Sequence, residues 1–223
     1  MDIKLFFQAI IKFMLGVVMI ALLLFIPANT INYWNAWLFM GLLFIPMFFA
    51  GIIMMIKSPD LLRKRLNAKE KLNEQKQVVL VSGLMFLISF VIAGLNYRYN
   101  WIVLSDVVVI ISSIIFLISY ILYAEVLREN AYLSRIIEVQ ENQKVIDTGL
   151  YGIVRHPMYA ATIFLFLSMH LVLGSVISFI IFLIYPFVIA KRIKNEEEFL
   201  EENLEGYVEY KKKVKYKVIP FIW

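Results

Sequence analysis

The sequence predicts an all-helical, polytopic integral membrane protein, and three observations lead to this fold class. Hydrophobic residues make up 61% of the 223 residues, and the mean hydropathy is +0.78, far above the values of water-soluble domains. Several apolar runs reach the length of about 20 residues that a helix needs to cross a bilayer. Basic residues flank these runs. Together the runs predict about six transmembrane helices.

Four apolar runs fill the first half of the chain. We expect them to span the membrane at residues 5–26, 34–56, 78–95 and 101–123. The polar stretch 57–77 between the second and third runs is rich in lysine and arginine, including Lys69 and Lys71, and contains few acidic residues. The positive-inside rule therefore places this basic loop in the cytoplasm.

The last apolar stretch, residues 158–190, is too long for one ordinary span and contains Gly174 and Ser175 near its middle. It predicts a tight hairpin of two transmembrane helices. The tail from Lys191 onward is charged and amphipathic, so we expect it to lie along the inner membrane surface. An even number of spans then places both termini in the cytoplasm. We divide the chain into four N-terminal helices, 1–123, and a C-terminal catalytic region, 124–223.

Composition also narrows the function classes. The chain has no cysteine and only two histidines, which excludes disulfides and thiolate ligands and argues against a metal site. The formal net charge of +5 comes from lysines and arginines that border apolar spans. We therefore attribute the basic balance to contact with an anionic membrane surface and expect no nucleic-acid partner.

A first polar cluster precedes the apolar stretch at residue 158, with the sequence Gly-Leu-Tyr-Gly-Ile-Val-Arg-His-Pro-Met-Tyr at 149–159. Pro157 suits the first turn of a helix, where its missing N–H is not needed. The free backbone donors at this helix start, with Arg155 beside them, predict a site for a carboxylate or phosphate. In the alternative interpretation Arg155 reaches lipid headgroups, His156 caps the helix and Tyr159 belongs to an interfacial aromatic belt.

A second polar cluster follows the apolar stretch. A helix would place Arg192, Glu196 and Leu200 on one face, with Glu197 beside Glu196. Carboxylates and tyrosine rings attract cations, and a sulfonium is such a cation. The alternative is an amphipathic surface helix with solvated charges, but both clusters are expected at the same membrane face, which favours a shared site.

These motifs resemble those of the isoprenylcysteine carboxyl methyltransferases and the related membrane phospholipid methyltransferases. The segment Ser-Pro-Asp-Leu-Leu-Arg-Lys-Arg-Leu at 58–66, the Arg-His-Pro-x-Tyr motif ending at Tyr159, and the Glu-Glu pair at 196–197 recur in the family's order. The resemblance implies an S-adenosylmethionine-dependent methyltransferase without a Rossmann fold. It implies a lipid or lipidated acceptor from the bilayer, either an isoprenylcysteine-like carboxylate or a phospholipid amine.

The resemblance also implies site residues. Arg155, His156 and Glu196 would be catalytic. The cofactor would be bound by Tyr151, Arg155, His156, Pro157, Tyr159, Glu196, Glu197, Tyr207 and Tyr210. The site would face the cytoplasm in the plasma membrane of a microbe.

Two other function classes stay open at this stage. Intramembrane charges would favour a non-enzymatic transporter or lipid-binding protein. The polar candidates, Asp106 and His170, are expected at the outer interface as ordinary capping groups. An NADPH-dependent membrane reductase is suggested by fold-level analogy alone, and the Arg-His-Pro-x-Tyr motif with Glu196 and Glu197 argues against it.

Overall fold

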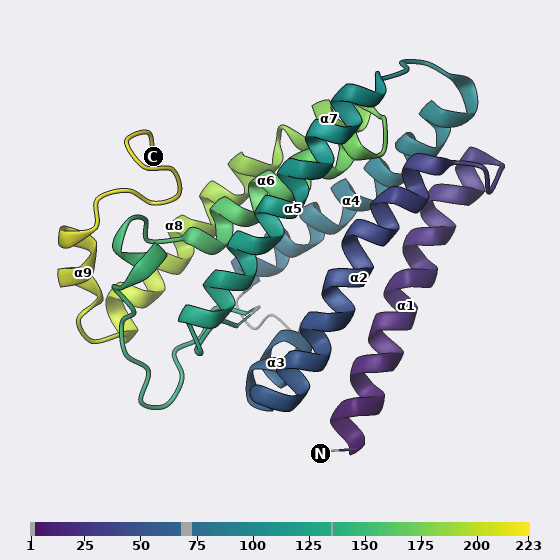
Figure 1. Cartoon of the computed structure of the whole chain (residues 1–223). Coiled ribbons are helices and arrows are strands. Elements are labelled where there is room, and N and C mark those ends of the chain that lie inside the picture. The colour runs from purple at the N-terminus through teal and green to yellow at the C-terminus, as the bar shows by residue number, and fades with distance from the viewer. Residues whose placement is uncertain (1–2, 68–72, 135) are drawn as a thin grey trace.

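The computed structural model describes residues 3–67, 73–134 and 136–223, and within these ranges every regular element is a helix (Figure 1). The α-helices are α1 (Ile3–Ala28), α2 (Trp34–Lys57), α3 (Pro59–Leu66), α4 (Asn73–Tyr99), α5 (Asp106–Glu129), α6 (Pro157–Val172), α7 (Val176–Phe182), α8 (Tyr185–Asn203) and α9 (Tyr207–Lys213). A short 3-10 helix, η1, covers Gly149–Gly152. The all-helical prediction is confirmed for the described residues.

Five segments among the described residues are long and apolar enough to cross a bilayer, which makes the chain an integral membrane protein. They are α1, α2, most of α4, α5, and α7 with α8 taken together. Helix α6 is apolar but has 16 residues, fewer than the roughly 20 of an ordinary span. A count of six spans therefore remains a prediction.

The predicted fourth span was misplaced. We expected it at 101–123, but α5 begins at Asp106 and continues to Glu129, into the stretch expected to be non-spanning. The apolar residues 101–105 form a loop because the Asn96 side chain accepts from the backbone N–H of Ile102 and donates to its carbonyl. The basic loop 57–77 contains α3 and the start of α4; Lys69 and Lys71 lie outside the described residues.

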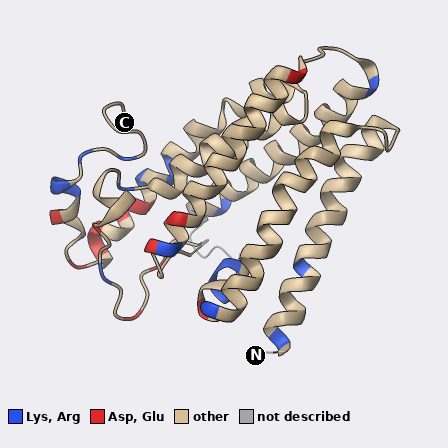
Figure 2. Cartoon of the chain, in the orientation of Figure 1, with Lys and Arg blue, Asp and Glu red and all other residues tan. Residues whose placement is uncertain are grey.

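Charge is strongly polarised along the helix bundle. Lysine, arginine and acidic residues gather at the end that holds α3 and α9, and the helix bodies are almost free of charge (Figure 2). Large apolar side chains such as Ile53, Ile110 and Ile121 are more than half exposed on these bodies. Contact with lipid tails explains this exposure, because water would not favour so much apolar surface.

The opposite end of the bundle, where Figure 2 shows few charged residues, is closed by side chains that bind the turn between α6 and α7. The amide of Asn35 on α2 donates to the carbonyl of Val172 at 3.0 Å, and that of Asn96 on α4 donates to Gly174 at 3.2 Å. The buried Tyr33 hydroxyl donates to Leu173. Gly174 adopts a φ of 73°, which favours glycine. These bonds fix the turn against α2 and α4.

Beyond this turn, α7 and α8 return antiparallel to α6. Phe166 and Tyr185 pack edge to face with ring centroids 5.2 Å apart, and His170 lies 4.3 Å from Phe182. The start of α6 therefore meets the end of α8 at the charged end. His170 is fully buried and neither ring nitrogen has a hydrogen-bond partner among the described residues, so our expectation of a capping role at the outer interface was wrong.

Gly94 allows close packing of α4 on α1. A Cβ at this position would lie 2.6 Å from the backbone oxygen of Leu24. The backbone of a packed helix cannot easily move away from such a contact. We predict that Gly94→Ala lowers the stability by about 1–3 kcal/mol, as overpacked positions do. Thermal unfolding in detergent measures this. Gly83→Ala on the same helix meets nothing within 4 Å and should leave the melting temperature unchanged or higher; equal melting of the two variants would contradict the packing argument.

Candidate active site

A pocket at the charged end lies between the connecting segment 130–146 and the helices α6, α8 and α9. Seven residues of the predicted set line it: Tyr151, Arg155, His156, Tyr159, Glu196, Tyr207 and Tyr210. Pro157 and Glu197 do not line the pocket, and each supports a residue that does. Pro157 takes the first position of α6, as its ring favours. The two polar clusters, about 40 residues apart in sequence, thus meet around one cavity.

Glu197 is the buried anion of this region, with only 2% of its surface exposed. Its carboxylate accepts from Arg155 Nε at 2.7 Å and lies 3.2 Å from His156 Nε2. Lys217 places its Nζ 2.9 Å from the second carboxylate oxygen. A buried carboxylate is stable only when cations and donors surround it in this way. The interpretation of this helix as one with only solvated charges is therefore wrong.

Arg155 also holds the segment that follows α9. Its Nη1 donates to the carbonyls of Val214 at 2.6 Å and Lys215 at 2.9 Å. The backbone N–H groups of Arg155 and His156 donate to the carbonyls of Tyr216 and Lys217. The Arg155 guanidinium and the two backbone N–H groups before the helix are therefore used by the chain itself, and the anion site at the start of α6 remains a prediction.

The same contacts decide against the alternative roles of the first cluster. Arg155 and His156 are each 6% exposed, so neither reaches into solvent or headgroups. His156 occupies the N-cap position of α6, but its side chain makes no capping hydrogen bond. Tyr159 is 4% exposed and belongs to the interior rather than to an interfacial belt.

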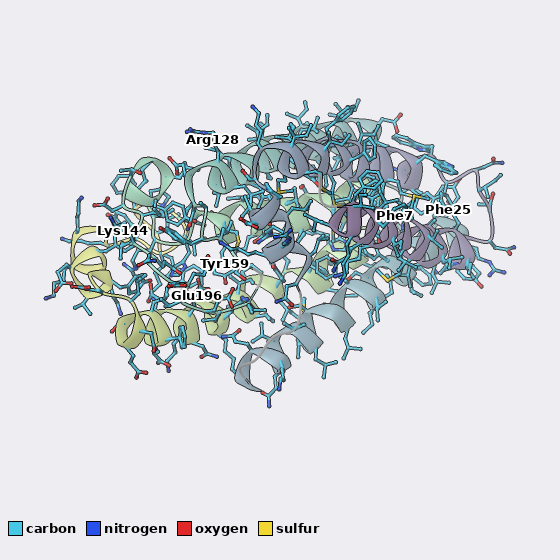
Figure 3. All side chains as sticks on the ribbon, turned by 90° about the horizontal axis from the view of Figure 1, so that it is seen from below. Phe7, Phe25, Arg128, Lys144, Tyr159 and Glu196 are labelled. Atoms are coloured by element: carbon cyan, nitrogen blue, oxygen red, sulfur yellow. The ribbon has the colours of Figure 1, made fainter. Side chains whose placement is uncertain are left out.

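Tyr159 connects α6 to the second cluster. Its hydroxyl donates to the Glu196 carboxylate and accepts from Arg192 Nε at 2.8 Å. Figure 3, a view from below, shows Tyr159 and Glu196 next to each other. Arg192 reaches on to the side-chain oxygen of Gln75 at the start of α4. Arg192 and Glu196 line the pocket with Leu200, which confirms that these three residues share one face of α8.

Three further tyrosines, Tyr151, Tyr207 and Tyr210, line the same pocket. Tyr210 donates to the carbonyl of Tyr151 at 2.7 Å, and the Tyr151 hydroxyl accepts from Asn130. The Tyr207 hydroxyl is buried and has no hydrogen-bond partner among the described residues. Burial raises the pKa of Tyr207, and the nearby carboxylates of Glu197 and Glu196 raise it further. This phenol therefore stays protonated near neutral pH and can donate to a ligand.

Sequence reasoning missed the wall built by the connecting segment. Its pocket residues include Asn130, Tyr132, Ile137, Lys144 and Val145. This segment has no regular secondary structure, so no periodic pattern identifies the inward residues. The glycine at position 149 was the one signal in the sequence that pointed to this segment. In the structure Gly149 has a φ of 52°, and a Cβ there would collide with Glu129. Glu129 in turn accepts from the backbone of Leu150 at 3.0 Å and fixes the end of the segment.

The sequence of this region also resembles that of a known protein family. Residues 107–202 match the model of the isoprenylcysteine carboxyl methyltransferase (ICMT) family. This part of the chain is similar to the ICMT family. The match covers somewhat less than half of the chain, from the start of α5 almost to the end of α8. It supports a membrane methyltransferase. No curated protein matches the chain.

The ICMT-family match contains both polar clusters but ends before Tyr207 and Tyr210. These two tyrosines enter the site on the geometry alone, because they line the same pocket as Tyr159 and Glu196. Helices α1–α4 precede the match, and α5 lies within it except for its first residue. Neither the family match nor the pocket tests the division of the chain at residue 123, which remains a prediction.

Removing the negative charge of Glu197 should destabilise the charged end of the protein. We predict that Glu197→Gln lowers stability by about 3 kcal/mol, because Arg155 loses its charged partner in a buried position. Thermal unfolding in detergent measures the loss. Glu198→Gln is the matched control, since this neighbour is 62% exposed and its lysine partner is 3.8 Å away. Wild-type melting of Glu197→Gln would show that the network does not hold the fold.

Proposed function

We propose that this protein transfers a methyl group from S-adenosylmethionine to a lipidic acceptor in the pocket at its charged end. The observation that carries the proposal is the convergence of the Arg-His-Pro-x-Tyr segment and the Glu-Glu segment on one cavity within the ICMT-family match. The family match supports methyl transfer in general. The cofactor, the acceptor and the individual roles of the residues are our inference.

The residues present fit a sulfonium cofactor. Tyr207 has a buried hydroxyl at the pocket wall that has no hydrogen-bond partner among the described residues. Glu196 provides a carboxylate at the same wall. The aromatic rings of Tyr151 and Tyr210 provide faces that attract a cation. When bound, the cofactor would supply a methyl group on a positively charged sulfur, which leaves as a neutral thioether. We propose that these residues, with Tyr159, hold it.

The buried network supports the pocket from behind. We propose that Arg155 and His156 line the cavity and position the tail, while Glu197 and Pro157 hold them in place. Because transfer from a sulfonium is an in-line displacement, rigid alignment of acceptor and methyl group supplies most of the catalysis. The closed wall 130–146 would exclude water that solvates the acceptor.

Two acceptor classes fit the proposal. A carboxylate is ionised at neutral pH and needs no base, and the positive charge of Arg192 at the pocket wall would orient it. An amine must lose a proton, and Glu196 faces the cavity within hydrogen-bond distance of Tyr159. In both cases the apolar part of the acceptor would come from the bilayer, since Leu133, Ile137 and Met158 also line the cavity.

The topology belongs to the same proposal. Six spans, with α6 and the α7–α8 segment as a membrane hairpin, would place both termini on one side. The basic residues around α3 favour the cytoplasm for that side. The pocket lies at this charged end, where a cytosolic cofactor could reach it. The membrane would be the plasma membrane of a microbe.

Cofactor binding tests the proposal directly. We predict that detergent-purified protein binds S-adenosylhomocysteine in calorimetry, and that Glu196→Ala weakens the binding of the positively charged S-adenosylmethionine by at least tenfold through loss of a charged contact. Glu198→Ala, two residues away and exposed, should bind as the wild type does. Full binding by Glu196→Ala would remove this residue from the site.

Tyr207→Phe provides a finer test of the pocket wall. The change removes a single hydroxyl that has no partner among the described residues of the protein, so stability should not fall. Affinity for S-adenosylhomocysteine should fall about three- to tenfold, as expected for one neutral hydrogen bond. A variant with wild-type affinity would mean that the Tyr207 hydroxyl does not reach the cofactor.

Parallel measurements with NADPH separate the other function classes. Binding of NADPH in place of S-adenosylhomocysteine would favour a membrane reductase. If a demonstrably folded protein binds neither, a transporter or lipid-binding role would replace the enzyme proposal.

A further inference from the structure

The last six residues, Val218–Trp223, form a turn that we call the C-terminal tip. After α9 the chain does not continue away from the bundle but turns back alongside it (Figure 1). Val218 is buried in the main hydrophobic core, and Ile219 and Trp223 pack against that core, which is built from the apolar helices. The C-terminal tip therefore packs beside apolar parts of the bundle.

Two large apolar side chains of the C-terminal tip face outward. Phe221 is 86% exposed and Ile222 is 80% exposed, which places them among the most exposed apolar side chains of the described residues. Their neighbours Val218 and Trp223 are packed, so this exposure is specific to the outer side of the turn. Such a pair on a surface that faced water would have an unfavourable hydration free energy.

The backbone holds this exposed arrangement against local strain. Phe221 has a φ of 65°, a left-handed conformation that is rare for a bulky residue. The turn is kept closed by the backbone oxygen of Trp223, which accepts from the N–H groups of Lys217, Val218 and Ile219. An over-determined strained turn that presents two apolar side chains indicates a binding role for them.

Lysines in the chain that leads to the C-terminal tip indicate the partner chemistry. Lys212 and Lys215 are exposed and have no ion-pair partner among the described residues, whereas Lys213 and Lys217 pair with Asp147 and Glu197. Unpaired cations on α9 and in the chain that leads to an exposed apolar pair match the interface of an anionic bilayer, where tails receive the apolar groups and headgroups receive the lysines.

We propose that the C-terminal tip inserts Phe221 and Ile222 into the bilayer, with Lys212 and Lys215 on anionic headgroups. This contact is linked to the pocket, because the segment between α9 and the tip carries the carbonyls that bind Arg155 and His156. The lipid contact thus steadies one support of the site. The insertion itself does not depend on methyl transfer, so it can be tested separately.

The absence of cysteine makes a site-specific probe simple. Ile222→Cys, labelled with a nitrobenzoxadiazole fluorophore, is reconstituted into vesicles of phosphatidylcholine and phosphatidylglycerol. We expect blue-shifted emission, strong quenching by lipids spin-labelled near the headgroup, and severalfold weaker quenching by aqueous iodide than at a Glu209→Cys control. Glu209 is exposed on the polar helix α9. Equal iodide quenching at both positions would overturn the proposal and leave the pair available to a soluble partner.

A second measurement tests the linkage. Ile222→Ser, which keeps the contact of Phe221 with Tyr216 at 5.2 Å between ring centroids, should accelerate amide hydrogen exchange of residues 214–217 severalfold in vesicles, while thermal unfolding of the helices stays near wild type. Unchanged exchange in a variant that no longer contacts lipid would refute the linkage. Identical label insertion in pure phosphatidylcholine vesicles would refute the part assigned to Lys212 and Lys215.

Discussion

The buried carboxylate of Glu197 is the constraint on which the functional end of this protein depends. An ionised carboxylate away from water is tolerated only with cations and donors around it. Here the partners come from two other segments, the turn before α6 and the chain after α9. Three parts of the chain must therefore assemble together, and the pocket is the space that their assembly leaves.

The two ends of the bundle are held by different forces. At the charged end, the Arg155–Glu197 pair combines electrostatic attraction with hydrogen bonds to the tail. At the other end, neutral amides and the Tyr33 hydroxyl bind backbone carbonyls of the turn. Neutral hydrogen bonds suit a region with little water, because they satisfy polar groups without placing a charge there. Between the two ends the helices rely on apolar packing, which explains why close approach at Gly94 matters.

The sequence was informative where a repeating physical rule applied. Apolar runs of bilayer length located α1, α2 and α4 well, and helical spacing correctly grouped Arg192, Glu196 and Leu200. It failed at α5, where the apolar residues 101–105 look like helix but are held as a loop by Asn96. The carbonyls of the tail that bind Arg155 could not be predicted either, since backbone carbonyls carry no residue-specific signal in the sequence. The pocket wall at 130–146 escaped for a similar reason, because irregular backbone has no period.

The turn between α6 and α7 bears on how the protein is made. Asn35 and Tyr33 sit at the start of the second helix, and the carbonyls that they bind are made 137 and 140 residues later. Until the last helices arrive, these polar groups lack their final partners in or near the bilayer. The early helices are then an incomplete assembly that the membrane quality-control machinery can recognise, and docking of the C-terminal region completes them. Maturation of the N-terminal half thus depends on synthesis of the C-terminal half, so a chain truncated before α6 should be degraded rather than accumulate as a stable fragment.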